Sequence, residues 1–127
     1  MKNIYLSLLV LVCFFGCKKN DDAAPVDTKP VTKDLVVQIS STQQFSYSIT
    51  ETDTVTNDFD NKEGYDVTTL NYTFTPKPGH KVIVEAVSSA TATFTTSLTY
   101  DGKAIGPVVP VKDASHTSFI FNYTVPK

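Results

Sequence analysis

The stretch "FTTSLTYDGK", residues Phe94–Lys103, carries the two signals that decide the fold. One face of its first part carries Phe94, Leu98 and Tyr100, whereas the alternate positions hold only Thr and Ser. Alternation with a period of two is typical of a half-buried β-strand. The Asp-Gly pair after this strand suits a two-residue hairpin, because a type I′ turn needs positive φ at both central positions. The stretch therefore predicts a strand and then an antiparallel hairpin.

The same alternation recurs over most of the chain that surrounds this hairpin. It appears in 35–39, 45–50, 70–75 and 119–125, and no segment after residue 33 has a helical period. Turn residues separate the segments: Pro76–Gly79 precedes a strand over 81–87, and Gly106, Pro107 and Pro110 restrict the segment after the hairpin to a short, bent or edge strand. Residues 34–127 are therefore predicted to form an all-β domain, an antiparallel β-sandwich of about seven strands with an immunoglobulin-like architecture.

The amino-terminal residues have the pattern of an export signal. Lys2 supplies the positive charge, Ile4–Phe15 is an apolar run, and the small residue Gly16 precedes Cys17. The run is too short for a bilayer span, which needs about 20 apolar residues. Residues 1–16 are therefore predicted to be a cleaved signal peptide.

The sequence Phe14-Phe15-Gly16-Cys17 resembles the lipobox of bacterial lipoproteins. The resemblance implies that the signal is cut just before Cys17 and that this cysteine is acylated, so that membrane lipid becomes a partner of the protein. Cys13 lies within the apolar run and is lost with the signal. Residues 17–33 contain Pro25 and Pro30 and no apolar period, which indicates a flexible tether.

The order of residues after the anchor, two lysines and then Asp21 and Asp22, resembles the leaders of Bacteroidota lipoproteins. In that group a charged stretch after the cysteine is associated with the outer face of the outer membrane. The resemblance implies a surface-exposed outer-membrane lipoprotein, with the periplasmic face as the alternative.

Part of the β domain, 45–106, is similar to small lipoproteins with a domain related to the MmpS transport-accessory proteins. The segments "FSYSIT", "LNYTFTPKPGHKVIVEA" and "SLTYDGKAIG" carry this similarity, although the Pro-Trp of that family is absent. The similarity implies an accessory subunit of an envelope transport system. The alternative is a non-enzymatic binding or assembly module, with an envelope protein or a glycan as its ligand.

The amino-acid composition argues against nucleic-acid binding, cysteine chemistry and enzymatic activity. All 11 basic residues are Lys and the net charge is −2, so no Arg fork or basic stripe is available for nucleic acid. Once the leader is removed, no cysteine other than Cys17 remains for a disulfide, a thiolate nucleophile or a metal site. His80 and His116 fall in expected exposed loops, and neither has the sequence context of a catalytic triad. We therefore expect no enzymatic activity and no cofactor.

The acidic stretch "ETDTVTNDFDNKEGYD", residues 51–66, is predicted to be a solvated loop whose side chains the core does not need. It holds six carboxylates, which favour a counter-ion or a basic partner. Asp58, Asp60 and Glu63 are candidate Ca²⁺ ligands, but Lys62 between them repels a cation, so a metal-free loop is preferred. Phe59 and Tyr65 either cover one end of the sandwich or form an exposed aromatic contact. Asp53-Thr54-Val55 resembles the O-glycosylation motif of Bacteroidota, which implies a glycan on Thr54.

Changing Cys17 to Ser tests the anchor. Each buried acyl methylene stabilises membrane attachment by about 0.8 kcal/mol, and several chains together make the attachment stable. We expect the wild-type protein to enter the detergent phase on phase partitioning and the Cys17→Ser variant to move to the aqueous phase. Unchanged partitioning would contradict a lipid anchor at this residue.

Overall fold

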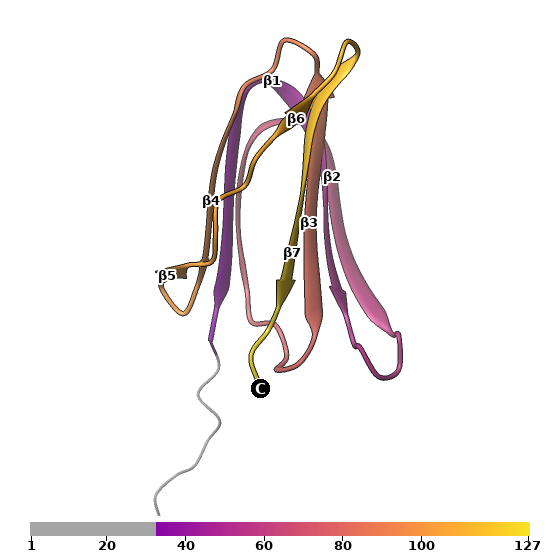
Figure 1. Cartoon of the computed structure of the whole chain (residues 1–127), viewed down its shortest axis with the longest axis vertical. Helices are drawn as coiled ribbons and strands as arrows, with labels where there is room; N and C mark the ends of the chain where they lie inside the picture. Colours follow the sequence, from indigo (N-terminus) through magenta and orange to yellow (C-terminus); the bar gives the residue numbers. More distant parts are fainter. Residues whose placement is uncertain (1–32) are drawn as a thin grey trace, which may run out of the picture. The chain divides into compact units, whose positions relative to one another are not determined.

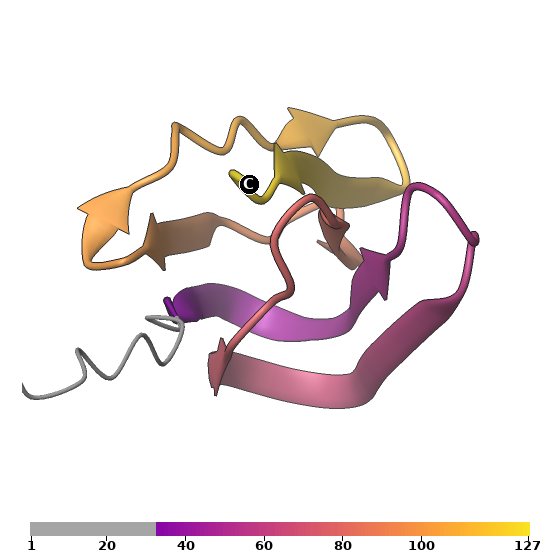
Figure 2. The ribbon, with the colours of Figure 1, turned by 90° about the horizontal axis from the view of Figure 1, so that it is seen from below.

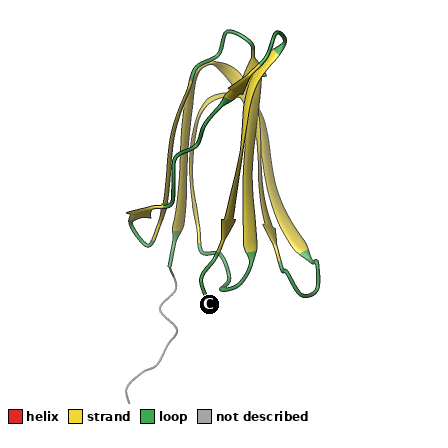
Figure 3. Ribbon diagram, in the orientation of Figure 1, coloured by secondary structure: helices red, strands yellow, loops and turns green. Residues whose placement is uncertain are grey.

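The computed structural model describes residues 33–127, in which seven strands are joined by turns and loops (Figures 1 and 3). The strands are β1 (Leu35–Thr52), β2 (Phe59–Phe74), β3 (Lys81–Ser89), β4 (Phe94–Tyr100), β5 (Lys103–Ala104), β6 (Val111–Lys112) and β7 (His116–Thr124). This part of the chain contains no helix, and therefore none long and apolar enough to cross a membrane. The prediction of an all-β, antiparallel domain of about seven strands is confirmed. The predicted signal peptide (1–16), Cys17 and the tether up to residue 32 lie outside the described residues.

All seven strands belong to one antiparallel sheet, and β1 is its central strand. The order is β5-β4-β1-β3-β7-β6, with β2 paired to β1 alone. The first half of β1 lies between β4 and β2, and its second half lies between β3 and β2. The two alternating segments 35–39 and 45–50 are thus parts of a single 18-residue strand.

A bulge between these halves bends the sheet. Ser40 pairs with Thr69 and Phe45 pairs with Val67, so four residues of β1 oppose Thr68 alone. An extra residue in one strand bends it and increases its twist. Seen along the strands, the sheet curls so that its two halves face each other, as in a sandwich (Figure 2).

Side chains and backbone of neighbouring strands satisfy the polar groups of the bulge. The buried Ser88 hydroxyl donates to the carbonyl of Gln44 at 2.6 Å, and the amide of Thr42 donates to the carbonyl of Thr93 at 3.2 Å. Because an unpaired buried polar group costs about 1–3 kcal/mol, the bond to Gln44 allows the Ser88 hydroxyl to be buried beside the bulge.

Three aromatic rings pack in the space inside the bend. Phe94 meets Phe45 and Phe119 edge-on, with ring centroids 5.5 Å and 5.3 Å apart. Such pairs contribute about 0.5–1.5 kcal/mol beyond the burial of their area. Aliphatic side chains from alternate positions of the strands complete the core: Leu35, Val37, Ile39, Ile49, Val82, Val84, Ala86, Leu98 and Val125. The alternation in the sequence therefore predicted the buried face correctly.

The Asp-Gly hairpin forms as predicted. Tyr100 pairs with Lys103, and the two residues between them, Asp101 and Gly102, have φ values of 52° and 71°. The strand after the turn, β5, is only two residues long. The chain then crosses to β6 on the other half of the sheet (Figure 1), and Pro107 and Pro110 in this crossing explain why no long strand forms there.

Gly64 in β2 is required by an aromatic neighbour. It pairs with Tyr47 of β1, and a Cβ atom at this position would overlap the Tyr47 ring. Glycine normally weakens a strand, but here it gives the ring the room to lie across the backbone.

The prediction of a solvated loop over 51–66 is wrong. β1 continues to Thr52 and β2 begins at Phe59, so only Asp53–Asp58 forms a turn. Thr52 pairs with Phe59, and the ladder continues from there to Ser48 and Glu63. Both faces of β2 are largely exposed along Phe59–Asp66, so this part of the strand needs no apolar alternation and its sequence does not show the usual signal.

Candidate functional site

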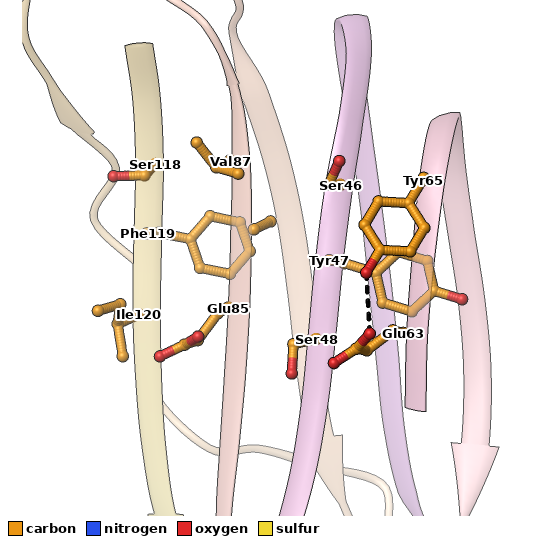
Figure 4. A pocket seen from close by; sticks show the side chains of 11 residues that line it. Ser46, Tyr47, Ser48, Glu63, Tyr65, Glu85, Val87, Ser118, Phe119 and Ile120 are labelled. Atoms are coloured by element: carbon orange, nitrogen blue, oxygen red, sulfur yellow. Dashed lines mark hydrogen bonds between the residues drawn. The ribbon is translucent and has the colours of Figure 1, made fainter. Parts of the chain in front are cut away.

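A shallow groove of about 320 Å³ lies on the face of the sheet that points away from the core. We call it the outer groove. Its lining includes Ser46 and Ser48 of β1, Glu63 and Tyr65 of β2, Glu85 and Val87 of β3, and Ser118 and Ile120 of β7. Figure 4 shows the serines between the β2 side chains on one side and the β3 and β7 side chains on the other.

The register of the strands creates this groove. Ser48 pairs with Glu63 on one side and with Glu85 on the other, so all three side chains point to the same face in one row. Ile120 extends the row because it pairs with Glu85. The central strand presents small hydroxyl side chains while its neighbours present longer ones, which leaves a hollow over Ser46 and Ser48.

A chain of hydrogen bonds fixes the β2 side of the groove. Tyr65 Oη donates to Glu63 Oε2 at 2.9 Å, and Asn61 Nδ2 donates to Glu63 Oε1 at 2.6 Å. Asn61 Oδ1 in turn accepts bonds from the hydroxyls of Ser48 and Thr50, at 3.0 Å and 3.1 Å. The hydrogen bond that Tyr65 donates to the Glu63 carboxylate raises the pKa of Tyr65 above the usual 10.0, and the negative charge of Glu63 adds to this effect. Tyr65 therefore remains a protonated donor at neutral pH, and its hydrogen bond orients the Glu63 side chain.

The opposite side of the groove carries two solvent-exposed aliphatic side chains beside Glu85 and Ser118. Val87 is 45% exposed and Ile120 is 65% exposed. Single exposed aliphatic side chains are common on monomeric proteins, whereas apolar side chains that adjoin one another on a surface can mark a binding site. Neither residue was predicted from the sequence, although the signal is present: both occupy positions where the alternation of their strands calls for a polar side chain.

The aromatic pair of β2 does not cover an end of the sandwich. Phe59 is 68% exposed and Tyr65 is 67% exposed. The interpretation of these rings as a lid is therefore wrong, and both rings are exposed, as the alternative of an exposed aromatic contact requires. Tyr65 belongs to the outer groove, whereas Phe59 is the first residue of β2 and lies beside the turn between β1 and β2.

A second cluster, which we call the turn clasp, joins the β1–β2 turn to the β2–β3 loop. His80 Nδ1 lies 2.9 Å from Glu51 Oε1, and His80 Nε2 lies 3.6 Å from Asp53 Oδ2. Glu51 Oε1 also accepts the amide of Lys77 at 2.7 Å. The prediction of an exposed loop histidine is wrong for His80, whose side chain is only 15% exposed. The acidic side chains at the end of β1 therefore have a structural role that the sequence did not indicate.

Asp53 also holds the turn itself. Its Oδ1 accepts the amides of Val55 at 2.7 Å and Thr56 at 3.3 Å. The bond from the Val55 amide lowers the pKa of Asp53 from 3.8 most strongly, and the bond from the Thr56 amide comes next. Desolvation raises this pKa, and the nearby His80 lowers it to a smaller extent. Thr54, the candidate for O-glycosylation, is exposed in the same turn, and its hydroxyl donates to the carbonyl of Gly79 at 3.3 Å.

The three candidate calcium ligands do not converge. Asp58 and Asp60 line a small cavity of about 130 Å³ with His80, whereas Glu63 lies in the outer groove. Asp60 and Glu63 are three positions apart in β2, and side chains three apart in a strand point to opposite faces. Within residues 33–127, no group of three or more His, Cys, Asp and Glu side chains is arranged to hold a metal ion.

The turn before β7 brings together a serine, a histidine and an aspartate in a form that differs from a catalytic triad. Ser115 Oγ and Asp113 Oδ2 both lie 3.0 Å from the same nitrogen, Nδ1 of His116. A triad needs the hydroxyl on one ring nitrogen and the carboxylate on the other. The amides of His116 and Ser115 donate to Asp113 Oδ1 and lower the pKa of this carboxyl below 3.8, so the aspartate stabilises the turn.

A comparison of the chain with protein-family models, curated proteins and solved structures finds no match.

Asp53→Asn tests the turn clasp through its pH dependence. The pKa of Asp53 is lower in the folded state than its unfolded-state value near 3.8, so the charged carboxylate stabilises the fold above pH 3.8. This stabilisation disappears as the pH falls through the lowered pKa. We expect Asp53→Asn to lower the free energy of unfolding at pH 7, with a difference from wild type that narrows below pH 3.8. Urea denaturation of both proteins at several pH values measures this difference in the free energy of unfolding.

Asp58→Asn is the matched control, because no described residue donates a hydrogen bond to the Asp58 carboxylate. It should change stability little at any of these pH values. An Asp53→Asn effect of the same size at acidic and neutral pH would contradict the assigned role of the charge.

Proposed function

We propose that the chain is a cell-envelope lipoprotein, anchored through acylated Cys17, whose β domain is a non-catalytic binding module. The outer groove is the binding site in this proposal. The observation that carries it is the combination, on one exposed sheet face, of unpartnered aliphatic side chains and an oriented Glu63–Tyr65 pair.

The chemistry of the groove suits binding. Ligand sites commonly combine apolar contact area with a few placed polar groups that fix the orientation of the ligand. Val87 and Ile120 supply the apolar area, and Glu63 supplies an acceptor that Asn61 and Tyr65 hold in place. Because the groove is shallow and extends across four strands, it suits an extended segment of an envelope protein or a glycan chain better than a small enclosed molecule.

Both histidine clusters support a non-enzymatic role. His80 is held between two carboxylates in the turn clasp, and His116 contacts Ser115 and Asp113 through one nitrogen only. Within the described residues, neither contacts a hydroxyl or thiol in the arrangement needed to activate a nucleophile.

The sequence pattern of residues 1–33 supports the proposed location. A lipid at Cys17 and a tether to residue 33 would hold the domain at the membrane surface, on the outer face of the outer membrane or on its periplasmic face. The partners in this proposal are membrane lipid at the anchor and an envelope protein or glycan in the groove.

Photo-crosslinking in intact cells tests the groove. A diazirine amino acid at Val87 should give an adduct on irradiation, because this side chain lies in the proposed contact. Replacing Tyr65 with Ala in the same protein should reduce the adduct several-fold, since the ring and the orientation of Glu63 are lost together. Mass spectrometry of the adduct separates a protein partner from a glycan.

Ser97 on β4 is the matched control position, because it is exposed on the other half of the sheet. A probe there should give no adduct that depends on Tyr65. Equal labelling at Val87 and Ser97, or an adduct at Val87 that contains only a second copy of this chain, would contradict the proposed use of the groove.

A further inference from the structure

The outer groove carries negative charge that no cation of the described domain balances. Its lining includes two carboxylates, Glu63 and Glu85, and contains no lysine or histidine. Among residues 33–127, neither carboxylate belongs to an ion pair. The groove therefore presents two negative charges to any molecule that enters it.

The register of the strands explains why these charges are not balanced from within the domain. The four strands of the groove contain two lysines, Lys62 of β2 and Lys81 of β3. Lys62 pairs with the buried Ile49 and therefore points to the opposite face from Glu63. Lys81 stands four positions before Glu85, which is about 13 Å along an extended strand. Neither lysine therefore neutralises the groove.

The two carboxylates stand on either side of a small residue. Ser48 pairs with both Glu63 and Glu85, so the Cα atoms of the two glutamates are roughly 10 Å apart, given about 4.8 Å between strands. Figure 4 shows Glu85 beside Ile120, across Ser48 from Glu63. Each oxygen of the Glu63 carboxylate accepts one hydrogen bond, which leaves about two of its roughly four acceptor sites for a ligand. A cationic group above Ser48 is thus within reach of both side chains.

The aliphatic residues beside Glu85 match the rest of a long basic side chain. Val87 follows Glu85 on the same face of β3, and Ile120 pairs with Glu85 from β7. Lys and Arg combine an aliphatic stem, which covers apolar surface, with a charged end that stays hydrated or paired. A neutral sugar has neither a charge for the carboxylates nor an aliphatic stem for Val87 and Ile120. The charge and the apolar area of the groove therefore favour a basic peptide over a glycan.

We propose, on the basis of the function proposed above, that the outer groove binds an extended segment of a partner protein through a Lys or Arg side chain. The aliphatic stem of this side chain lies on Val87 and Ile120, and its charged end lies between Glu63 and Glu85. Complementary charge of this kind selects the correct partner and excludes acidic segments.

A short synthetic peptide that alternates Thr and Lys tests the charge of the partner. Its lysines repel one another and keep the peptide extended. Fluorescence anisotropy of the labelled peptide measures its binding to the full-length chain in a mild non-ionic detergent. We expect saturable binding that weakens as the salt concentration rises, and no binding of the counterpart peptide in which Glu replaces Lys.

Matched charge variants show whether the peptide binds in the groove. Glu63→Gln/Glu85→Gln removes two negative charges from the groove, and Asp58→Asn/Asp60→Asn removes two from the β1–β2 turn and the start of β2. We expect a dissociation constant at least ~3-fold weaker for the groove variant and an unchanged one for the control. Circular dichroism checks that both variants keep the sheet. Equal weakening by both variants, or no binding of the Lys peptide to the wild type, would overturn the proposal.

Crosslinking from Val87 in the Glu63→Gln/Glu85→Gln protein separates the charge of the partner from the use of the groove. We expect the adduct formed in intact cells to fall several-fold, and mass spectrometry to find a Lys or Arg in the crosslinked segment of the partner. An adduct that depends on Tyr65 but not on the two carboxylates, or an adduct with a glycan, would leave the proposed function standing and overturn the basic partner.

Two further outcomes of the crosslinking would also overturn the basic partner. The absence of any adduct that depends on Tyr65 would contradict the proposed function as well. An adduct on residues 17–32 of the same chain, which contain Lys18, Lys19 and Lys29, would show that the groove holds lysines of its own chain in place of a partner.

Discussion

The pairing of β1 with three other strands is the constraint on which the rest of the structure depends. Its first half joins β4 to β2 and its second half joins β3 to β2, so without it the sheet separates into unconnected pieces. The bulge before Phe45 then turns this one sheet into two facing halves. Phe45 enters the core directly after the bend and packs against Phe94, which connects the bend to the closure of the core.

The same strand also links the core to the candidate binding surface. Phe45 and Ile49 point inwards, whereas Ser46 and Ser48 between them form the floor of the outer groove. Because successive side chains of a strand alternate between faces, the register that buries the core also sets which side chains border the groove. A one-residue slip would bury the serines and expose Phe45 and Ile49. The stability of the fold and the geometry of the site are thus fixed by one set of backbone hydrogen bonds.

Those parts of the fold that rest on local patterns could be predicted from the sequence. The period of two identified the buried face, and the Asp101-Gly102 pair identified its hairpin. The bulge at Ser41–Gln44 could not be predicted in the same way, because it depends on partners such as Ser88 that are distant in the sequence. The first half of β2 was mistaken for a loop because its pairing with β1 overrides the weak strand preference of Asp, Asn and Gly.

The candidate site was harder to predict than the fold. The six carboxylates of 51–66 favoured a site for a counter-ion or a basic partner, yet Glu51 and Asp53 hold His80 and the neighbouring turn. The outer groove combines side chains from four strands, and only the register brings Glu63, Glu85 and Ile120 into one row. Exposed aliphatic residues at outward positions, such as Val87, are the one local signal of such a surface.

Hydrogen exchange of the β1 amides tests most directly whether one strand holds both halves of the domain together. Amides in the most stable cooperative unit of a protein open only with global unfolding. We expect the protected amides of Leu35–Ser41 and Phe45–Thr52 to exchange with the same opening free energy, equal to the free energy of global unfolding. Opening of one half of β1 at a distinctly lower free energy than the other would contradict the central role of this strand, because the two halves of the sheet would then be independent units.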